Sequence, residues 1–219
     1  MELYHVLNRG VDKRKIFLDP QDHARFVHDL YEFNDTAPAM EYSRRDVGPR
    51  RSHIRRRLVE IHGWVLMRNH YHLLLSELID GGMTRFLMKL NVGYAKYFNE
   101  KYSRSGTLFQ GRTKKILIEY EAHSLYILHY VHLNPLDYLT GAAKWRERDK
   151  GVIKSAKEAL KYLDGYRWSS YLDYCGRKNF PSILTKHRFE NERGNYKKTL
   201  EEYLRDGEAF PIAGPLALE

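Results

Sequence analysis

Two histidines one residue apart, His70 and His72, open the apolar run NHYHLLL. Side chains two residues apart in a β-strand point to the same face of the sheet, so the two imidazoles are expected side by side. The intervening tyrosine and the leucines would point to a core, while the imidazoles face a surface or cleft. Two neighbouring imidazoles can share one metal ion. The alternative is a pair of surface histidines on a half-buried strand, and a metal site needs a second element.

A tyrosine and an asparagine four residues apart, Tyr130 and Asn134, lie in the helical pattern EAHSLYILHYVHLN at residues 121–134. Because each residue advances about 100° around a helix, the two share one face, with Tyr126 one turn earlier. His132 points the other way and is expected to pack. If this helix lies beside the histidine strand, Asn134 can complete a metal site and Tyr130 stands next to it. The proline that follows disfavours helical geometry at Asn134 and places it in a frayed last turn.

These residue types fit the cleavage of a phosphodiester. A tyrosine that attacks phosphorus forms a phosphotyrosine ester, which conserves the bond energy so that a freed 3′-hydroxyl can rejoin strands. A divalent ion stabilises the charge that develops on the phosphate. Two imidazoles and an amide oxygen leave coordination positions open and suit Mg²⁺ or Mn²⁺, whereas a structural zinc site prefers four closed ligands.

The charge balance predicts a polyanionic partner. Lys plus Arg exceed Asp plus Glu by 37 to 28, which gives a net charge of +9. The segment SRRDVGPRRSHIRRR, residues 43–57, holds seven of the arginines against one aspartate and shows no apolar periodicity. We interpret it as a mobile loop that contacts phosphates; a solvated charged loop is the alternative. The expected DNA contacts are Arg44, Arg45, Arg50, Arg51, Arg55, Arg56, Arg57, Arg112, Lys114 and Lys115.

Length and composition indicate an ordinary globular protein. A chain of 219 residues is one domain with extensions, or two small domains, and is long enough to bury a core. A single cysteine, Cys175, excludes an internal disulfide framework and a multi-cysteine zinc site. No stretch is apolar for long enough to span a bilayer and no signal-peptide pattern is visible, so a cytoplasmic, nucleoid-associated protein is expected.

Strand and helix patterns alternate along the chain. The two strands at 58–67 and 70–77 form a hairpin at Arg68-Asn69, where asparagine tolerates the left-handed backbone of short turns. Antiparallel pairing follows from the hairpin, so we expect an α+β sandwich with helices packed on an antiparallel sheet. Further strands are predicted at 3–10 and 113–119, and helices from the Asp19 N-cap to about Asn34, at 83–100, at 121–134 and around 195–206.

Four motifs together resemble a known family. WVLMRNHYHLLL, LFQGR, HYVHLNP and WSSY occur in this order between about Tyr4 and Cys175. They resemble the REP-associated tyrosine transposases, a branch of the single-tyrosine HUH transposases of the insertion-sequence type, in which U is any hydrophobic residue. The resemblance implies a ferredoxin-like, RRM-like HUH nuclease fold. It also implies that His70 and His72 bind metal, that Asn134 is the third ligand and that Tyr130 is the nucleophile.

The resemblance also implies a substrate and a domain plan. Such proteins recognise imperfect palindromes folded as hairpins, so single-stranded or hairpin DNA is the expected partner and a 5′-phosphotyrosine the expected intermediate. The catalytic domain would span 1–140, with the basic loop at 36–57, and a basic helical extension would span 141–219. We expect a monomer, with a dimer as the alternative. Two features depart from the family pattern: Arg68 stands where proline is common, and the arginine loop looks like an insertion.

Three alternatives stay open at this point. The chain can be a domesticated nucleic-acid-binding protein that kept the fold without turnover, although all four proposed site residues are present. It can be a metal-dependent nuclease that uses water, in which case Tyr130 is a core residue and no covalent adduct forms. Tyr126 can be the nucleophile instead, although no asparagine follows it four residues later.

Overall fold

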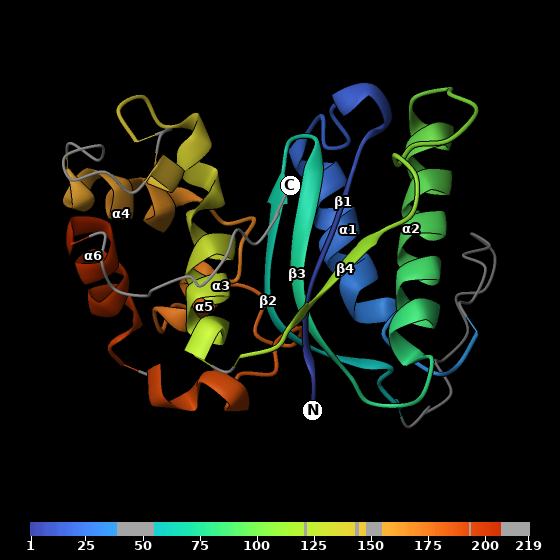
Figure 1. Cartoon of the computed structure of the whole chain (residues 1–219). Helices are drawn as coiled ribbons and strands as arrows, with labels where there is room; N and C mark the ends of the chain where they lie inside the picture. The colour runs from blue at the N-terminus through green and yellow to red at the C-terminus, as the bar shows by residue number, and fades with distance from the viewer. Residues whose placement is uncertain (39–54, 121, 143–144, 148–154, 193, 207–219) are drawn as a thin grey trace.

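The protein is built around a four-stranded antiparallel sheet with the strand order β2-β3-β1-β4. The computed structural model describes residues 1–38, 55–120, 122–142, 145–147, 155–192 and 194–206. Strands β3 and β1 are central and β2 and β4 form the edges (Figure 1). The strands are β1 (Leu3–Arg9), β2 (Val59–Met67), β3 (His70–Glu77) and β4 (Lys114–Ile118).

Helices α1 and α2 complete a ferredoxin-like unit with the chain order β1-α1-β2-β3-α2-β4. Both helices lie on the same face of the sheet, on the right in Figure 1. The strand order and the antiparallel pairing confirm the predicted α+β sandwich and its ferredoxin-like sheet. The two helices are α1 (Pro20–Glu32) and α2 (Gly82–Lys101).

The start of α1 follows from its local sequence. Asp19 is the N-cap and Pro20 is the first helical residue, where its missing N–H removes no hydrogen bond. The backbone N–H of Asp22 donates to the Asp19 carboxylate, and the backbone N–H of Asp19 donates to the Asp22 carboxylate. This reciprocal cap fixes where the chain turns from the first strand into the helix, as the sequence predicts.

Side-chain alternation along β3 sends Tyr71, Leu73 and Leu75 into the core beneath α1 and α2, and all three are fully buried. Phe26 of α1 and Phe86 of α2 pack in the same cluster. The prediction that these strand residues face a core is therefore confirmed. Residues of the opposite parity, which include the two histidines, face the other side of the sheet.

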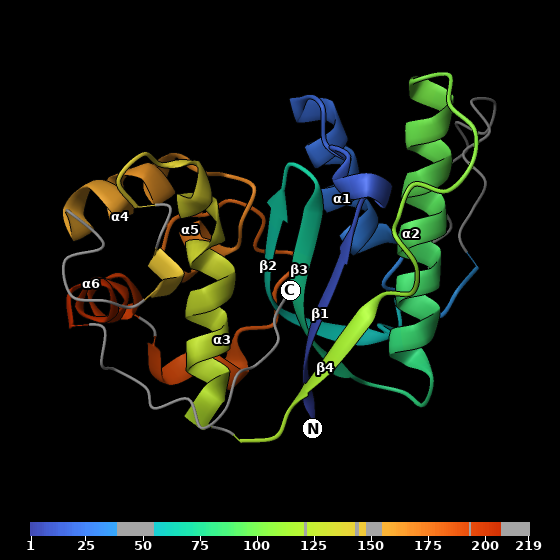
Figure 2. The ribbon, with the colours of Figure 1, turned by 45° about the horizontal axis from the view of Figure 1, so that its top comes forward.

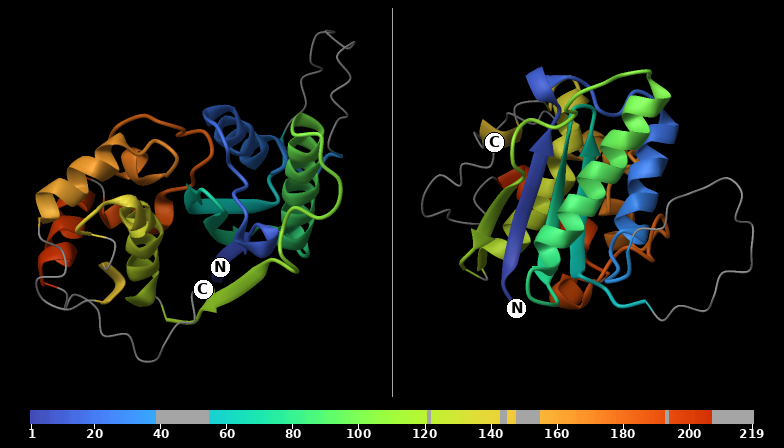
Figure 3. Two further views of the ribbon diagram at one scale, coloured as in Figure 1. Left: turned by 90° about the horizontal axis from the view of Figure 1, so that it is seen from above. Right: turned by 90° about the vertical axis from the view of Figure 1, so that its right-hand side faces the viewer.

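The other face of the sheet is covered by α3 and the C-terminal helices, as the view from above shows (Figure 3). Seen from the side of α1 and α2, in the right-hand part of the same figure, the sheet separates the two helical layers. Within the described residues, no helix has the length and apolar character that a membrane span requires. The helices of this layer are α3 (Ala122–Leu133), α4 (Ala156–Gly165), α5 (Tyr171–Tyr174) and α6 (Tyr196–Asp206), with 3₁₀ turns at Asn134–Tyr138, Trp145–Glu147 and His187–Glu192 and a fourth at Val11–Lys13 after β1.

Helix α3 lies close to the sheet because β2 offers it a glycine. Gly63 follows an irregularity in the pairing of β2 with β3. A Cβ at this position would lie 2.8 Å from the Leu128 side chain of α3, closer than real contacts allow. The glycine thus permits the helix to approach the strand face that carries the histidines.

Two sequence-based expectations are corrected by the structure. Residues 156–165, which the sequence analysis places in the basic extension without predicting a separate helix there, form α4, which Ser155 caps by accepting a hydrogen bond from the backbone N–H of Glu158. The hairpin turn at Arg68-Asn69 is present, but the non-glycine residues with positive φ in the described chain are Asp12, Lys13 and Ser103. The left-handed backbone expected at Asn69 is therefore wrong.

Candidate active site

His72 lies in the middle of the sheet, paired with Leu7 on β1 and Val65 on β2. Its side chain faces α3 and is 0% exposed, because α3 and the C-terminal helices cover this face. The expectation that both imidazoles face a surface or cleft is therefore wrong for His72. His70, two residues nearer the hairpin turn, is only partly buried. The pair therefore runs from the rim of the molecule into its interior, and the ring centroids are 4.9 Å apart.

Asn69 fixes the tautomer of His70. The Asn69 side-chain oxygen lies 2.7 Å from His70 Nδ1, and the Asn69 amide nitrogen donates to the Lys13 carbonyl. An amide oxygen only accepts hydrogen bonds, so Nδ1 of His70 carries the proton. Nε2 of His70 is then the nitrogen with a lone pair. This is the arrangement that metal-binding histidines show, with one nitrogen held and the other directed at the ion.

His5 on β1 forms a hydrogen bond with His72, and the sequence analysis missed it. His5 Nε2 lies 2.9 Å from His72 Nδ1, and the rings stack with centroids 5.0 Å apart. His72 Nε2 and His5 Nδ1 are buried and have no hydrogen-bond partner. If His72 donates from Nδ1 to His5, then Nε2 of His72 keeps a lone pair and can bind a cation. An orphaned buried nitrogen of this kind fits a metal ligand.

Burial keeps these inner histidines neutral. It lowers the pKa of His5 to about 3. Burial also lowers the pKa of His72 well below its ordinary value, and the nearby His70, His5 and Arg146 lower it further. A neutral imidazole is the form that coordinates a metal ion, so His72 is in the form that this role needs at neutral pH.

Helix α3 brings Tyr130 to His72 and His5, and Asn134 follows directly after the end of the helix. The Tyr130 ring lies edge-on to His72 and His5, with centroid separations of 5.7 and 5.9 Å. The Asn134 amide donates to the Tyr130 carbonyl at 2.7 Å and is fully buried at the start of the 3₁₀ turn that follows α3. Tyr130 is 3% exposed.

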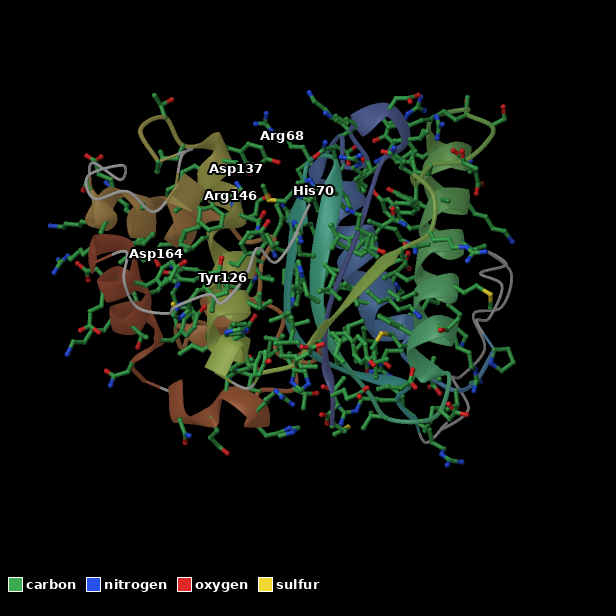
Figure 4. The ribbon with its side chains drawn as sticks, in the orientation of Figure 1. Arg68, His70, Tyr126, Asp137, Arg146 and Asp164 are labelled. Atoms are coloured by element: carbon green, nitrogen blue, oxygen red, sulfur yellow. The ribbon has the colours of Figure 1, made fainter. Side chains whose placement is uncertain are left out.

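Arg146 occupies the space beside Tyr130 and Asn134, and its sequence context gave no sign of this. Its Nη2 donates to the Asn134 side-chain oxygen at 2.8 Å, and its Nη1 donates to Asp137. Its guanidinium carbon lies 5.4 Å from the Tyr130 ring centroid. In Figure 4, Arg146 and Asp137 lie at the upper end of α3, on the side nearest His70.

His70 and His72 fit a divalent ion. The third proposed ligand, the Asn134 side-chain oxygen, also accepts a hydrogen bond from Arg146. Within the described chain, no group of three or more His, Cys, Asp and Glu side chains is arranged to hold a metal. A site here therefore depends on an amide oxygen as its third protein ligand. The Asn134 oxygen has two lone pairs, one of which accepts from Arg146. The second lone pair makes an oxygen ligand compatible with this hydrogen bond.

Other polar residues of α3 face the C-terminal helices. The Tyr126 ring lies 6.2 Å from that of Tyr203 on α6. His132 is fully buried, with Nδ1 on the Tyr196 hydroxyl and Nε2 2.7 Å from the Ser170 hydroxyl. The predicted packing role of His132 is confirmed, and Tyr130 is the helix tyrosine placed beside His5 and His72.

Arg68 ties the hairpin turn to the end of α3. Its backbone N–H donates to the Tyr138 hydroxyl at 2.9 Å, and its guanidinium lies 4.6 Å from the Tyr138 ring centroid. A proline at position 68 has no N–H and could not make the first contact. Figure 4 shows Arg68 beside the end of the hairpin that carries His70. The departure noted at this position therefore has a structural role next to the site.

Lys114 belongs to the same row of the sheet as His72. It pairs with Leu7, which pairs with His72, and cross-strand partners share a face. Lys114 is exposed at the edge strand, roughly 10 Å from His72 at two strand spacings. Lys115 points to the opposite face, where its ammonium donates to Thr84 of α2. Arg112 is exposed just before β4.

The described part of the arginine segment lies at the far end of β2. Ten residues separate Arg57 from Met67, a span of roughly 33 Å in an extended strand. Arg55 stacks on Tyr31, and Arg57 donates to the Thr185 hydroxyl. The structure does not bring Arg55, Arg56 and Arg57 to the histidines. Arg44, Arg45, Arg50 and Arg51 lie outside the described residues.

No protein-family model matches the chain, and no curated protein matches it. Among solved structures, the chain is similar to the structure of a REP-associated tyrosine transposase bound to a REP hairpin. The match covers 84% of this chain and 85% of that chain, with 15% sequence identity and a TM-score of 0.47. That transposase belongs to the family that the sequence motifs resemble. The function of the present chain is therefore argued from its own side chains.

Proposed function

We propose that the protein is a DNA endonuclease and strand transferase that works through a covalent 5′-phosphotyrosine on Tyr130. One observation carries this proposal: the ring centroid of Tyr130 on α3 lies 5.7 Å from that of the buried His72, whose Nε2 has no hydrogen-bond partner. A metal-assisted attack on phosphorus requires a nucleophile close to a nitrogen or oxygen atom that can bind the metal. Tyr126 faces α6 instead.

His70, His72 and Asn134 would hold a divalent ion, Mg²⁺ or Mn²⁺. When bound, such an ion withdraws charge from the scissile phosphate and so lowers the barrier to attack. Asn69 holds His70 in the tautomer that leaves Nε2 for the ion, and His5 would do the same for His72 by accepting from its Nδ1. Loss of either partner should therefore weaken metal binding without removing a ligand.

Tyr130 would carry the covalent step. Its phenolic oxygen forms a bond to phosphorus while the bond from phosphorus to the 3′ oxygen breaks. The phenolic proton passes to solvent and the leaving 3′ oxygen takes up a proton, so the products are a 5′-phosphotyrosine and a 3′-hydroxyl. Attack by a 3′-hydroxyl on this ester reverses the sequence and joins strands. Because Tyr130 is nearly buried, the phosphate must approach from the rim, where His70 and Arg146 are partly exposed.

Single-stranded or hairpin DNA is the proposed substrate. The strand would follow the edge of the sheet, where Arg112 and Lys114 are exposed and Lys114 lies in the row of His72. Residues 1–140 would form the catalytic unit, and the described helices of the segment 141–219 would pack against α3 on the side of the histidines. The packing of α4 and α6 with α3 in one core agrees with this role.

Covalent trapping tests the function directly. Labelled single-stranded DNA that contains the hairpins flanking the gene is incubated with the wild type, Tyr130→Phe and Tyr126→Phe, with Mn²⁺ or EDTA. The expected result on a denaturing gel is a Mn²⁺-dependent protein–DNA adduct that is lost only in Tyr130→Phe. Cleavage without an adduct would favour a nuclease that uses water. Binding without cleavage would indicate a domesticated nucleic-acid-binding protein, and either outcome contradicts the proposal.

A further inference from the structure

Arg146 is the charged side chain in direct contact with both the proposed nucleophile and a proposed metal ligand. It belongs to the 3₁₀ turn Trp145–Glu147, twelve residues beyond Asn134 in the chain. Its guanidinium donates to the Asn134 oxygen at 2.8 Å and lies 5.4 Å from the Tyr130 ring centroid. Neither contact is needed to pair the arginine, because Asp137 already neutralises it.

The position of this guanidinium is fixed by its neighbours. Asp137 accepts from Arg146 and also from the Trp145 indole nitrogen, the latter at 2.8 Å. The Trp145 ring lies 4.4 Å from the guanidinium carbon and 5.5 Å from the Tyr130 ring. An arginine held on two sides in this way loses little further freedom when it binds a ligand.

Arg146 is nevertheless accessible, because 29% of its side chain is exposed. A buried structural ion pair would not need this opening. The exposed part lies next to a nearly buried tyrosine, so a phosphate that reaches Tyr130 has to pass the guanidinium. Planar guanidinium groups match phosphate oxygens with paired N–H donors, and arginines near a transferring phosphoryl group stabilise its charge.

We propose that Arg146 is a further catalytic residue, which binds a non-bridging oxygen of the scissile phosphate and stabilises the negative charge on the attacking Tyr130 oxygen. The proposal rests on the phosphotyrosine function argued above. It adds a second positive group to the site, on the side of Tyr130 that faces the 3₁₀ turn. The covalent step is unchanged: phosphorus bonds to Tyr130, and the 3′ oxygen leaves.

The contact of Arg146 with Asn134 also affects metal binding. A cation bound at the histidines and the Arg146 guanidinium repel each other, and both use the Asn134 oxygen. Removing the charge of Arg146 should therefore leave Mn²⁺ affinity unchanged or raise it by about twofold to tenfold. A residue that merely holds the fold together would lower Mn²⁺ affinity when it is changed.

The test compares full-length wild type with Arg146→Met, Arg146→Gln and Arg146→Lys. Arg177→Met is the matched control, since Arg177 also pairs with an aspartate, Asp164, within the C-terminal layer. Adduct formation on hairpin DNA is measured in single-turnover reactions with Mn²⁺. Titration calorimetry gives Mn²⁺ affinity, and thermal melting reports the fold. Gln retains an amide that can donate without charge, whereas Lys retains the charge.

We expect Arg146→Met and Arg146→Gln to form adduct about 100-fold more slowly than wild type, with Arg146→Lys in between and Arg177→Met unchanged. Mn²⁺ affinity should not fall. If Arg146→Met does not fold, the comparison of adduct formation by Arg146→Gln and Arg146→Lys tests the proposal. Equal rates for Gln and Lys, rates near wild type, or loss of Mn²⁺ affinity would overturn the proposal. No adduct with wild type would instead remove the phosphotyrosine function itself.

Discussion

At the scale of single residues, the candidate site depends on which nitrogen of each imidazole carries a proton. Asn69 settles this for His70 by accepting from its Nδ1. His5 settles it for His72 only if His5 Nε2 is the acceptor, which requires His5 to carry its own proton on Nδ1. In this arrangement the N–H at His5 Nδ1 is buried without an acceptor, which costs free energy. A cation bound to the lone pair of His72 Nε2 would offset that cost.

His5→Phe tests this coupling. The ring keeps its size and stacking, but His72 loses the acceptor that fixes its tautomer. We expect Mn²⁺ affinity, measured by titration calorimetry, to fall about 10-fold to 100-fold, as for other partners of metal-binding histidines. His23→Phe is the control, since His23 lies on α1 and stacks between Phe17 and Trp168, away from the site. Unchanged Mn²⁺ affinity in a folded His5→Phe protein would mean that His5 does not set the tautomer in which His72 binds metal.

Four residues of the candidate site are predicted from the sequence, for a physical reason. His70 and His72 are paired by strand alternation, and Tyr130 and Asn134 by helical spacing, so each pair follows from local geometry. The partners His5 and Arg146 lie 67 and 12 residues from the groups they contact. Their roles depend on the register of β1 with β3 and on a 3₁₀ turn, and a local pattern carries neither.

At the scale of elements, the prediction of strands and helices succeeds wherever one face is apolar at a regular period. The first helix and the histidine hairpin are of this kind, and α1 begins at its predicted cap. Helix α4 was missed because its basic surroundings hide a short apolar stripe of Ala159, Leu160 and Leu163. The hairpin forms without the expected left-handed backbone at Asn69. The carbonyls of Arg68 and Asn69 accept hydrogen bonds from backbone N–H groups of the segment after β1, and these contacts hold the turn.

The edge strand β4 offers two adjacent lysines that point to opposite faces, and this makes a matched pair of variants. Lys114 lies in the row of His72, whereas Lys115 donates to Thr84 beneath α2. In the Tyr130→Phe background, Lys114→Ala should weaken single-stranded DNA binding and reduce the slope of log affinity against log salt by about 0.7, one lost phosphate contact. Lys115→Ala should leave the slope unchanged. Equal effects of the two changes would show that DNA does not follow the histidine face.

At the scale of the whole molecule, the sheet supports two cores with different tasks. The core under α1 and α2 is apolar, with Phe26, Phe86 and Tyr94 fully buried. The core on the other face also holds polar groups, among them the buried histidines His5, His72, His129 and His132. Helix α3 lies next to this face, and α6 packs on the outer side of α3 (Figure 2). The face that carries the site is therefore also the one most sensitive to acid.

His129 makes that sensitivity measurable, because it lies away from the proposed metal ligands, against Tyr196 and Tyr203 of α6. Burial lowers its pKa from 6.5 to about 3. In the unfolded chain the ring binds a proton below pH 6.5, but in the folded protein only near pH 3, so protons favour unfolding between these values. Stability is complete above pH 6.5 and falls by about 1.4 kcal/mol per pH unit for this one group.

His129→Leu should therefore flatten the pH dependence of the unfolding free energy by about 1.4 kcal/mol per pH unit between pH 6 and 4. The measurement is urea unfolding at several pH values in EDTA, which keeps metal binding out of the comparison. The slope decides the outcome, whatever the substitution does to stability at pH 7. His28→Leu, which removes a partly exposed imidazole from α1, is the control for a substitution of the same kind outside this core. A wild-type slope in His129→Leu would mean that this histidine is already protonated, or exposed to water, in the folded protein.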